Sequence, residues 1–302
     1  MNLKVQAHLN EALKHLYINP LEKCNLRCKI CYTKKTSPIL LNSEILEFIS
    51  RYQSVQQLDT ITFCGGEVFA LTSFPDLVNT LTDQGVFIQI ITNGTLDKLD
   101  LLRQPNSINL IVSLDGLEAL HDANRGEGNY KISTNFLKKA QRLGFNTEIF
   151  SVIHQQNIDH LDEFEAGLLN ELGFLPLVTY HPRKPPQYLS SHPIANILGE
   201  TENFEFLTQA QMLAVMKTRQ VFPPKKLGCY QIAVASDGKV YGCCEGTLAL
   251  GKISDSADDL ISNLTQRVAG WDKTNKWTGC LGCSQPDFMC GIRTYLQELY
   301  AD

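Results

Sequence analysis

Three cysteines near the start of the chain have a spacing that suits iron chemistry. Cys24, Cys28 and Cys31 lie in the segment Cys-Asn-Leu-Arg-Cys-Lys-Ile-Cys. Four-iron clusters are held by cysteine thiolates, normally four of them. Three thiolates leave one iron open, and an open metal position is where a substrate binds. The alternative is a structural zinc site whose fourth ligand comes from elsewhere in the chain.

The other cysteines fall mostly in the last quarter of the chain. They are Cys229, Cys243, Cys244, Cys280, Cys283 and Cys290, while Cys64 stands apart and is expected to be a small buried residue. In a reducing compartment such groups are metal ligands rather than disulfides. Seven cysteines remain beyond the first three, one fewer than two fully cysteine-ligated clusters need. One further cluster is therefore expected.

The composition is that of an ordinary globular protein. The 302 residues are 43% hydrophobic and 20% charged, with a formal net charge of -5. No basic face or acidic tail points to nucleic acid or to an anionic membrane. No apolar run approaches the roughly 18 residues that span a bilayer, and the first residues lack the pattern of a signal peptide. We therefore expect a cytoplasmic protein without a nucleic-acid or membrane partner.

Strand and helix patterns alternate through the first two thirds of the chain. After a helical lead-in at 1–14, strands are expected at 15–19, 60–63, 87–91, 108–112, 147–153 and 177–180, and helices at 41–52, 74–84, 96–102, 130–143 and 161–172. This alternation predicts an α/β fold with a parallel sheet. Barrel-like folds carry their chemistry just past the strand ends. Six units predict a partial (β/α)6 TIM-like barrel that stays open.

Glycine and polar motifs follow the expected strand ends. They are Gly65-Gly66-Glu67, Thr92-Asn93-Gly94, Ser113-Leu114-Asp115-Gly116 and His121-Asp122-Ala123-Asn124-Arg125-Gly126. Taken singly, each has a plain structural explanation, because Asn-Gly and Asp-Gly favour turns by themselves. Arg125 alone would be a surface salt-bridge partner.

The cysteine loop and these motifs, in this order, resemble the radical S-adenosylmethionine (SAM) family. The resemblance implies a [4Fe-4S] cluster on Cys24, Cys28 and Cys31, whose open iron binds SAM and whose electron cleaves it to a 5'-deoxyadenosyl radical. The SAM contacts that it implies are Gly65, Gly66, Glu67, Asn93, Ser113, Asp115, Arg125 and Ile153. The first three would hold the methionine ammonium, Ser113 or Asp115 the ribose, and Arg125 the methionine carboxylate. The family usually has Thr or Ser and Pro where this chain has Cys64 and Val68.

The C-terminal region resembles the SPASM/twitch extension of that family, a small α+β unit that holds auxiliary clusters. Turn residues predict a hairpin of 232–235 and 239–241. We therefore divide the chain into a barrel at 1–207 and an auxiliary-cluster domain at 208–302. As in the twitch branch, one auxiliary [4Fe-4S] cluster is expected on Cys229, Cys243, Cys280 and Cys283, with Cys290 as the rival ligand. Zinc on the same four cysteines is the alternative.

Relatives with such extensions mostly modify peptides, so the resemblance implies a maturase of a ribosomally made precursor peptide. Crosslinking, excision or splicing, and oxidation all stay open. Candidate catalytic residues are Tyr180, His181 and Glu245, and Cys244 stands where sulfatase-maturing relatives place an acid. The cysteine loop begins at residue 24, so we expect leader recognition by a separate small protein. A flavodoxin or ferredoxin is the implied electron donor. The alternatives are a twitch-type dehydrogenase of a small molecule and, from another class, a non-catalytic metal-binding scaffold.

Overall fold

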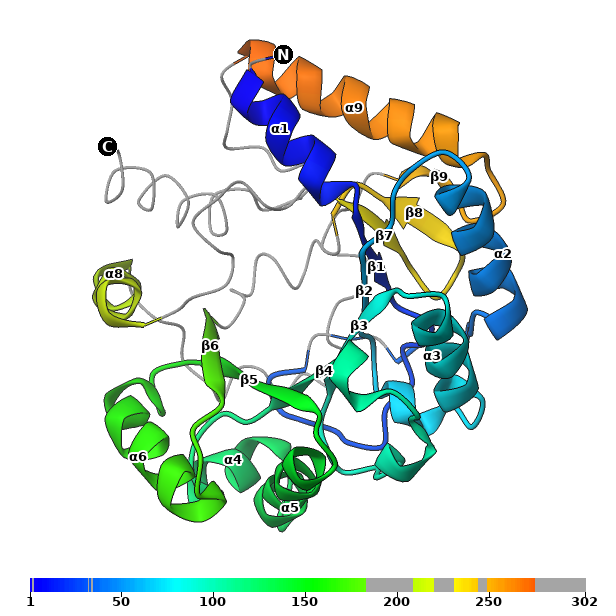
Figure 1. Ribbon diagram of the computed structural model, residues 1–302. Helices are drawn as coiled ribbons and strands as arrows, with labels where there is room; N and C mark the ends of the chain where they lie inside the picture. The colour runs from blue at the N-terminus through cyan, green and yellow to red at the C-terminus, as the bar shows by residue number, and fades with distance from the viewer. Residues whose placement is uncertain are drawn as a thin grey trace.

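A single curved sheet forms the frame of the protein. The computed structural model describes residues 1, 3–31, 33, 35–182, 209–219, 231–243 and 249–274, and all structural statements concern these residues. Nine strands follow the order β6-β5-β4-β3-β2-β1-β7-β8-β9. Figure 1 shows the strands arranged in an arc, and helices α2, α3, α5 and α6 lie on the outer, convex side of this arc.

The elements have the following bounds. The strands are β1 (His15–Ile18), β2 (Thr60–Phe63), β3 (Phe87–Thr92), β4 (Ile108–Ser113), β5 (Asn146–Ile153), β6 (Leu177–Pro182), β7 (Ile232–Val234), β8 (Lys239–Tyr241) and β9 (Ala249–Lys252). The α-helices are α1 (Leu3–Ala12), α2 (Asn42–Gln53), α3 (Phe74–Asp83), α4 (Glu118–Arg125), α5 (Asn129–Arg142), α6 (Leu161–Leu172), α8 (Gln209–Thr218) and α9 (Ala257–Thr274).

Strands β1 to β6 are all parallel, and each pairs with its sequence neighbour. The expected α/β partial barrel is thereby confirmed. Parallel strands need a crossover connection, which the helices provide. The outer face is apolar because helices cover it. The buried residues of α2 recur every three or four positions and form such a covering stripe: Ile45, Phe48, Ile49 and Tyr52.

The concave face of the barrel carries polar side chains on its central strands. His15 Nε2 lies 2.7 Å from Thr62 Oγ1, and Thr62 Oγ1 donates to Gln89 Oε1 over 2.7 Å. These residues alternate with outward-facing core residues such as Leu16, Ile61 and Ile88. A polar inner face indicates that the barrel interior accepts polar groups or water.

The C-terminal hairpin extends the barrel sheet. Strand β7 pairs in parallel with β1, whereas β8 and β9 continue the sheet in antiparallel fashion. Arg51 Nη2 of α2 donates to Ile253 O over 2.5 Å, so this part is also bonded to the barrel. The hairpin was expected, and so was a helix in this region, although without bounds; β9 and α8 were not expected. The proposed division at 207/208 lies outside the described residues.

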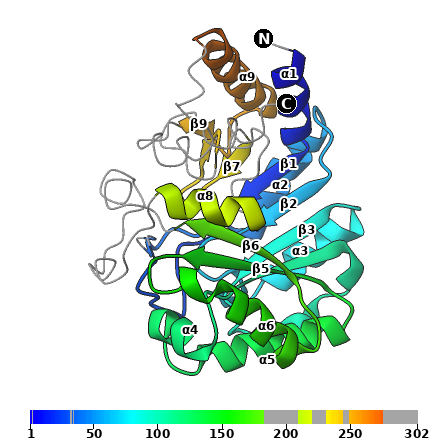
Figure 2. The ribbon, with the colours of Figure 1, turned by 90° about the vertical axis from the view of Figure 1, so that its left-hand side faces the viewer.

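Two further features separate the structure from the sequence expectations. The expected helix at 96–102 is only a 3-10 turn at Leu99–Leu101, where Leu99 N donates to Asp97 Oδ1 over 3.1 Å. Helix α8 lies beside β6 (Figure 2), with Arg219 Nε donating to Glu165 Oε1 over 3.0 Å.

Across the described ranges, every helix is too short or too polar to serve as a membrane span.

Candidate active site

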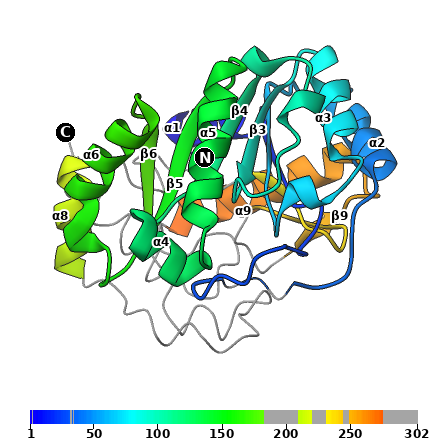
Figure 3. The same cartoon turned by 90° about the horizontal axis from the view of Figure 1, so that it is seen from below.

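The cysteine loop belongs to the segment that connects β1 to α2, and it crosses the C-terminal ends of the central strands. Figure 3 shows this segment in dark blue. Main-chain hydrogen bonds hold it on both sides. Gly66 N donates to Leu21 O and Glu67 N to Lys23 O, both over 2.9 Å. On the other side Lys29 N donates to Asn124 O over 2.9 Å. The loop is thus a fixed part of the strand-end surface.

The two glycines after β2 are required by this close approach. A Cβ atom at Gly66 would lie 2.0 Å from Lys23 O, and one at Gly65 would lie 2.2 Å from Leu21 O. Gly65 also has a φ of +136°, which side chains with a Cβ rarely adopt. The Gly-Gly pair therefore seats the cysteine loop on the end of β2.

The three thiols lie close enough to influence one another. Burial raises the pKa of Cys28 to about 11; Arg125 opposes this shift, and the neighbouring Cys31 and Cys24 add to it. Cys24 Sγ accepts a hydrogen bond from Leu26 N over 3.3 Å. In the described part of the chain no three His, Cys, Asp or Glu side chains converge as ligands of a single metal ion. A [4Fe-4S] cluster takes each thiolate on a different iron, so the three cysteines of this loop would serve three of its irons.

Glu67 lies at the turn between the cysteine loop and β3, fully buried. Its Oε1 accepts from Phe69 N over 3.1 Å and from Thr92 Oγ1 over 2.8 Å, and its Oε2 accepts from Asn93 N over 2.8 Å. Burial raises the pKa of Glu67, and these donors oppose the rise. Glu67 thus ties the end of β2 to the end of β3.

Asn93, at the end of β3, contacts the cysteine loop directly. Its Nδ2 lies 3.0 Å from Asn25 Oδ1 and 3.7 Å from Cys24 Sγ. Its Oδ1 accepts from Thr95 N over 2.8 Å, and Ser133 Oγ donates to its carbonyl oxygen over 2.7 Å. The amide is therefore oriented toward the first cysteine by its other bonds.

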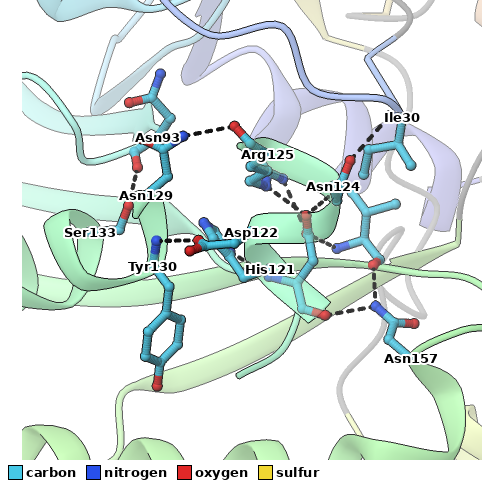
Figure 4. A network of polar contacts seen from close by, with 12 residues as sticks. Ile30, Asn93, His121, Asp122, Asn124, Arg125, Asn129, Tyr130, Ser133 and Asn157 are labelled. Atoms are coloured by element: carbon cyan, nitrogen blue, oxygen red, sulfur yellow. Dashed lines mark hydrogen bonds and ion pairs between the residues drawn. The ribbon is translucent and has the colours of Figure 1, made fainter. Parts of the chain in front are cut away.

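Asp115 and Arg125 pair with each other. Figure 4 shows Arg125 beside Asn124 in this network of polar contacts. Arg125 Nε lies 2.6 Å from Asp115 Oδ2, and Arg125 Nη2 lies 3.1 Å from Asp115 Oδ1. Asn124 Nδ2 and Val152 N also donate to this carboxylate, over 2.5 and 2.9 Å. The pair was expected to bind two different parts of SAM, and here each residue orients the other. Ser113 ends β4 in register with Phe150.

Tyr180 and Ile153 lie on the helix-covered face of the sheet, away from the barrel interior. Ile153 belongs to the apolar core, and Tyr180 Oη donates to Glu165 Oε1 of α6 over 2.6 Å. The expectation that Tyr180 faces a substrate is corrected by this position, since alternate residues of a strand point to opposite faces. His181 lies on the opposite, concave face, with its ring 5.5 Å from that of Phe150.

Cys243 lies at the opposite edge of the sheet from the first cysteine loop. It follows β8, which runs antiparallel to β7 and so ends near the start of β1. Its side chain is buried. The other expected C-terminal site residues lie outside the described residues: Cys229, Glu245, Cys280, Cys283 and Cys290, together with Cys244. Cys243 and Cys24 therefore lie toward opposite ends of the β1 strand direction.

Sequence reasoning overlooked the supports of the Asp115 turn. His121 Nδ1 accepts from Asp115 N over 3.3 Å, and Asn157 Nδ2 donates to Asp115 O over 2.7 Å. Burial lowers the pKa of His121 to about 4, so its ring is neutral at pH 7. Helix α4, which carries His121, Asn124 and Arg125, has eight residues, and its buried residues are the polar His121 and Asn124. The signal was its position directly after Asp115-Gly116.

A family model described as the Radical SAM superfamily matches residues 18–166. This range contains the cysteine loop, the Gly-Gly-Glu turn and the Asp115–Arg125 pair. The chain belongs to the radical SAM superfamily, which implies SAM and a [4Fe-4S] cluster as its cofactors.

Individual relatives are similar over part of their length. The sporulation killing factor maturation protein SkfB of Bacillus subtilis is 26% identical over 158 residues, which cover 50% of this chain and 38% of SkfB. The mycofactocin maturase MftC of Mycolicibacterium smegmatis is 31% identical over 150 residues, 47% of this chain and 38% of MftC. The structure of native anSMEcpe with bound AdoMet and Cp18Cys peptide has a TM-score of 0.68 at 17% identity, over 94% of this chain and 95% of that chain, and so shares the fold.

Proposed function

We propose that this radical SAM enzyme modifies a ribosomally made precursor peptide. The observation that carries the proposal is the cysteine loop, fixed by its main chain over the strand ends beside the polar interior of an open barrel. A peptide side chain that enters this interior meets hydrogen-bonding groups rather than a closed apolar core. Crosslinking, excision or splicing, and oxidation are the reactions considered.

Cys24, Cys28 and Cys31 would hold the cluster, and the residues around them fit this task. When bound, the cluster and SAM supply a radical that removes a hydrogen atom from an unactivated carbon. Residues around the cysteine loop hold it, and the charged group beside it, in place. Gly66 brings β2 against the loop, Asn93 points its amide toward Cys24, and Asp115 holds Arg125 beside Cys28. The proposed SAM contacts are Gly65, Gly66, Glu67, Asn93, Ser113, Asp115 and Arg125, without Ile153, which belongs to the apolar core on the other face of the sheet.

A peptide substrate is supported by the comparisons. The maturation protein SkfB and the maturase MftC are similar in sequence, and a structure of the same fold holds a peptide. Because the chain covers 38% of SkfB and of MftC, the partners come to this chain as proposals only. They are a precursor peptide, a separate small leader-recognition protein, and a flavodoxin or ferredoxin as electron donor.

A second, auxiliary [4Fe-4S] cluster is also proposed, on Cys229, Cys243, Cys280 and Cys283, with Cys290 as the rival. The support is that Cys243 is buried at the sheet edge opposite the first loop. Two clusters require about eight iron atoms per chain and one requires about four. Iron near four with stoichiometric zinc would contradict the auxiliary cluster and favour a structural metal site.

The test of the proposed function is the mass of a peptide. The enzyme is co-expressed anaerobically with a short peptide encoded beside its gene and with any small neighbouring protein, and the intact peptide mass is compared with that from cells carrying the Cys28→Ala variant. A loss of hydrogens or of a residue fragment with the unaltered enzyme alone is the expected result. An unchanged peptide mass, together with release of 5'-deoxyadenosine by the purified enzyme, would redirect the assignment to a small-molecule substrate.

A further inference from the structure

The cysteine loop combines fixed geometry with a strong positive charge. Between residues 23 and 35 it has no Asp or Glu, and its basic residues are Lys23, Arg27, Lys29, Lys34 and Lys35. The whole chain, by contrast, has a formal net charge of -5. We propose that the exposed basic side chains of this loop, Lys23 and Arg27, form the docking surface for an acidic protein that donates single electrons. The proposal rests on the proposed function, because it assigns a partner to the same cluster.

The side chains of these two residues are exposed, on a loop whose main chain is hydrogen-bonded at Lys23 and at Lys29. Lys23 and Arg27 are exposed, whereas Lys29 and Lys35 are half-buried. Lys23 O accepts the hydrogen bond from Glu67 N, so the main chain beside Cys24 is fixed while the ammonium group projects outward. Lys35 Nζ donates to Leu26 O within the loop. The loop therefore presents two exposed cations on a hydrogen-bonded main chain.

These two cations directly precede two of the three proposed cluster ligands. Lys23 is followed by Cys24, and Arg27 is followed by Cys28. Electron transfer slows steeply with distance, so a donor protein must approach the cluster at the surface nearest to it. That surface is the outside of this loop. An electron donor that docks there meets the positive side chains first.

The charge of the surface selects the kind of partner. Clustered charges at the rim of an interface steer a partner of opposite charge and raise its rate of association. Electron-transfer encounters are brief and bury little surface, so a few exposed charges are enough to guide them. A nucleic acid fits less well, because the rest of the chain is acidic and no extended basic face is present in the sequence.

The experiment compares two charge reversals of the same residue type. Arg27→Glu changes the loop, and Arg142→Glu changes an exposed arginine at the end of α5. Because β5 begins at Asn146, just after Arg142, this arginine lies near the N-terminal ends of the strands, whereas the cysteine loop lies at their C-terminal ends. Both variants have the same net charge. Each holoenzyme is assayed for 5'-deoxyadenosine with reduced flavodoxin, an acidic protein, and separately with photoreduced 5-deazariboflavin, a neutral small reductant. Iron content is measured for each.

With flavodoxin at low salt, we expect kcat/KM with respect to flavodoxin to fall about tenfold for Arg27→Glu and to stay unchanged for Arg142→Glu. The difference should shrink as salt is raised, because exposed charges are screened. With 5-deazariboflavin both variants should equal the unaltered enzyme, with equal iron. Equal flavodoxin-supported rates for the two variants would overturn the docking surface, and so would a loss with both reductants. If the unaltered enzyme makes no 5'-deoxyadenosine with either reductant, the proposed function itself fails.

Discussion

Arg125 of α4 donates two hydrogen bonds to Asp115, which follows the end of β4. Nε donates to Oδ2 over 2.6 Å, and Nη2 donates to Oδ1 over 3.1 Å. The two side chains are 10% and 0% exposed. Burial alone would raise the pKa of Asp115, but Arg125, together with His121 and the main-chain donor Val152 N, opposes it and the pKa is lowered. Burial likewise opposes the charge of Arg125, which Asp115 and then Cys28 restore. The pair therefore keeps a cation beside the cysteine loop.

Removing the charge of Asp115 should destabilise the protein strongly. Asp115→Asn leaves the Arg125 guanidinium buried without its counter-ion, which costs about 3–5 kcal/mol. The exposed pair of Arg103 and Asp83 provides the control, with side chains 62% and 48% exposed, and Asp83→Asn should cost less than about 1 kcal/mol. Urea unfolding of the cluster-free variants measures both. Equal losses would contradict the role given to the buried pair.

Gly66→Ala should displace the cysteine loop. The new Cβ would lie 2.0 Å from Lys23 O, a main-chain atom that cannot move without the loop. We expect lower iron content after anaerobic reconstitution and a lower urea midpoint. Gly270→Ala is the control, because nothing lies within 4 Å of its Cβ position in α9, and it should be neutral or stabilising by up to about 1 kcal/mol. A Gly66→Ala variant with full iron and unchanged stability would refute the packing argument.

Glu67→Gln tests the link between β2 and β3. The amide can replace only one carboxylate oxygen, so its NH2 group must face a donor, either Asn93 N or the pair Phe69 N and Thr92 Oγ1. Two opposed buried donors should cost about 1–3 kcal/mol in the free energy of unfolding. Glu44→Gln alters an exposed carboxylate that accepts from Leu41 N and should change it by less than about 0.5 kcal/mol. The account is wrong if Glu67→Gln is as mild as Glu44→Gln.

His15 should make the protein sensitive to acid. Burial lowers the pKa of His15 from 6.5 to about 4, so the folded state keeps the ring neutral where the unfolded state binds a proton. Stability is therefore fully present above pH 6.5 and falls as the pH drops toward 4, because the unfolded state binds more protons in this window. His15→Gln should show a smaller loss of urea midpoint between pH 7 and pH 5 than the unaltered protein. An identical loss would show that His15 does not contribute.

The barrel was predictable because its strands and helices have strong local patterns. The strand at 60–63 and the helix at 161–172 were placed to the residue, and the apolar period of 130–143 gave α5 within one position. Helix α4 was missed because its buried residues are His121 and Asn124, which carry no apolar signal. The strand-end motifs marked the right edge of the sheet. Their mutual pairing depends on side-chain contacts across 6 to 10 positions around Asp115 and across 25 positions between Glu67 and Thr92, which sequence spacing does not specify.

The faces of the strand-end residues were also hard to foresee. Tyr180 and His181 are neighbours, yet one bonds to α6 and the other packs beside Phe150 in the barrel. A shift of one residue in the end of a strand exchanges its two faces. Only the register with β5 decides between them, and that register comes from tertiary pairing.

The claim that the first cysteine loop holds the catalytic cluster is tested most directly by one comparison. Cys28→Ala is measured against Cys64→Ala, which removes a thiol from the end of β2 that is not expected to bind iron. Each variant is reconstituted anaerobically and assayed for 5'-deoxyadenosine from SAM with 5-deazariboflavin. We predict none from Cys28→Ala, because a cubane with two thiolates leaves a second iron unheld, and near-normal release from Cys64→Ala. Sustained turnover by Cys28→Ala would contradict the assignment of the cluster to this loop.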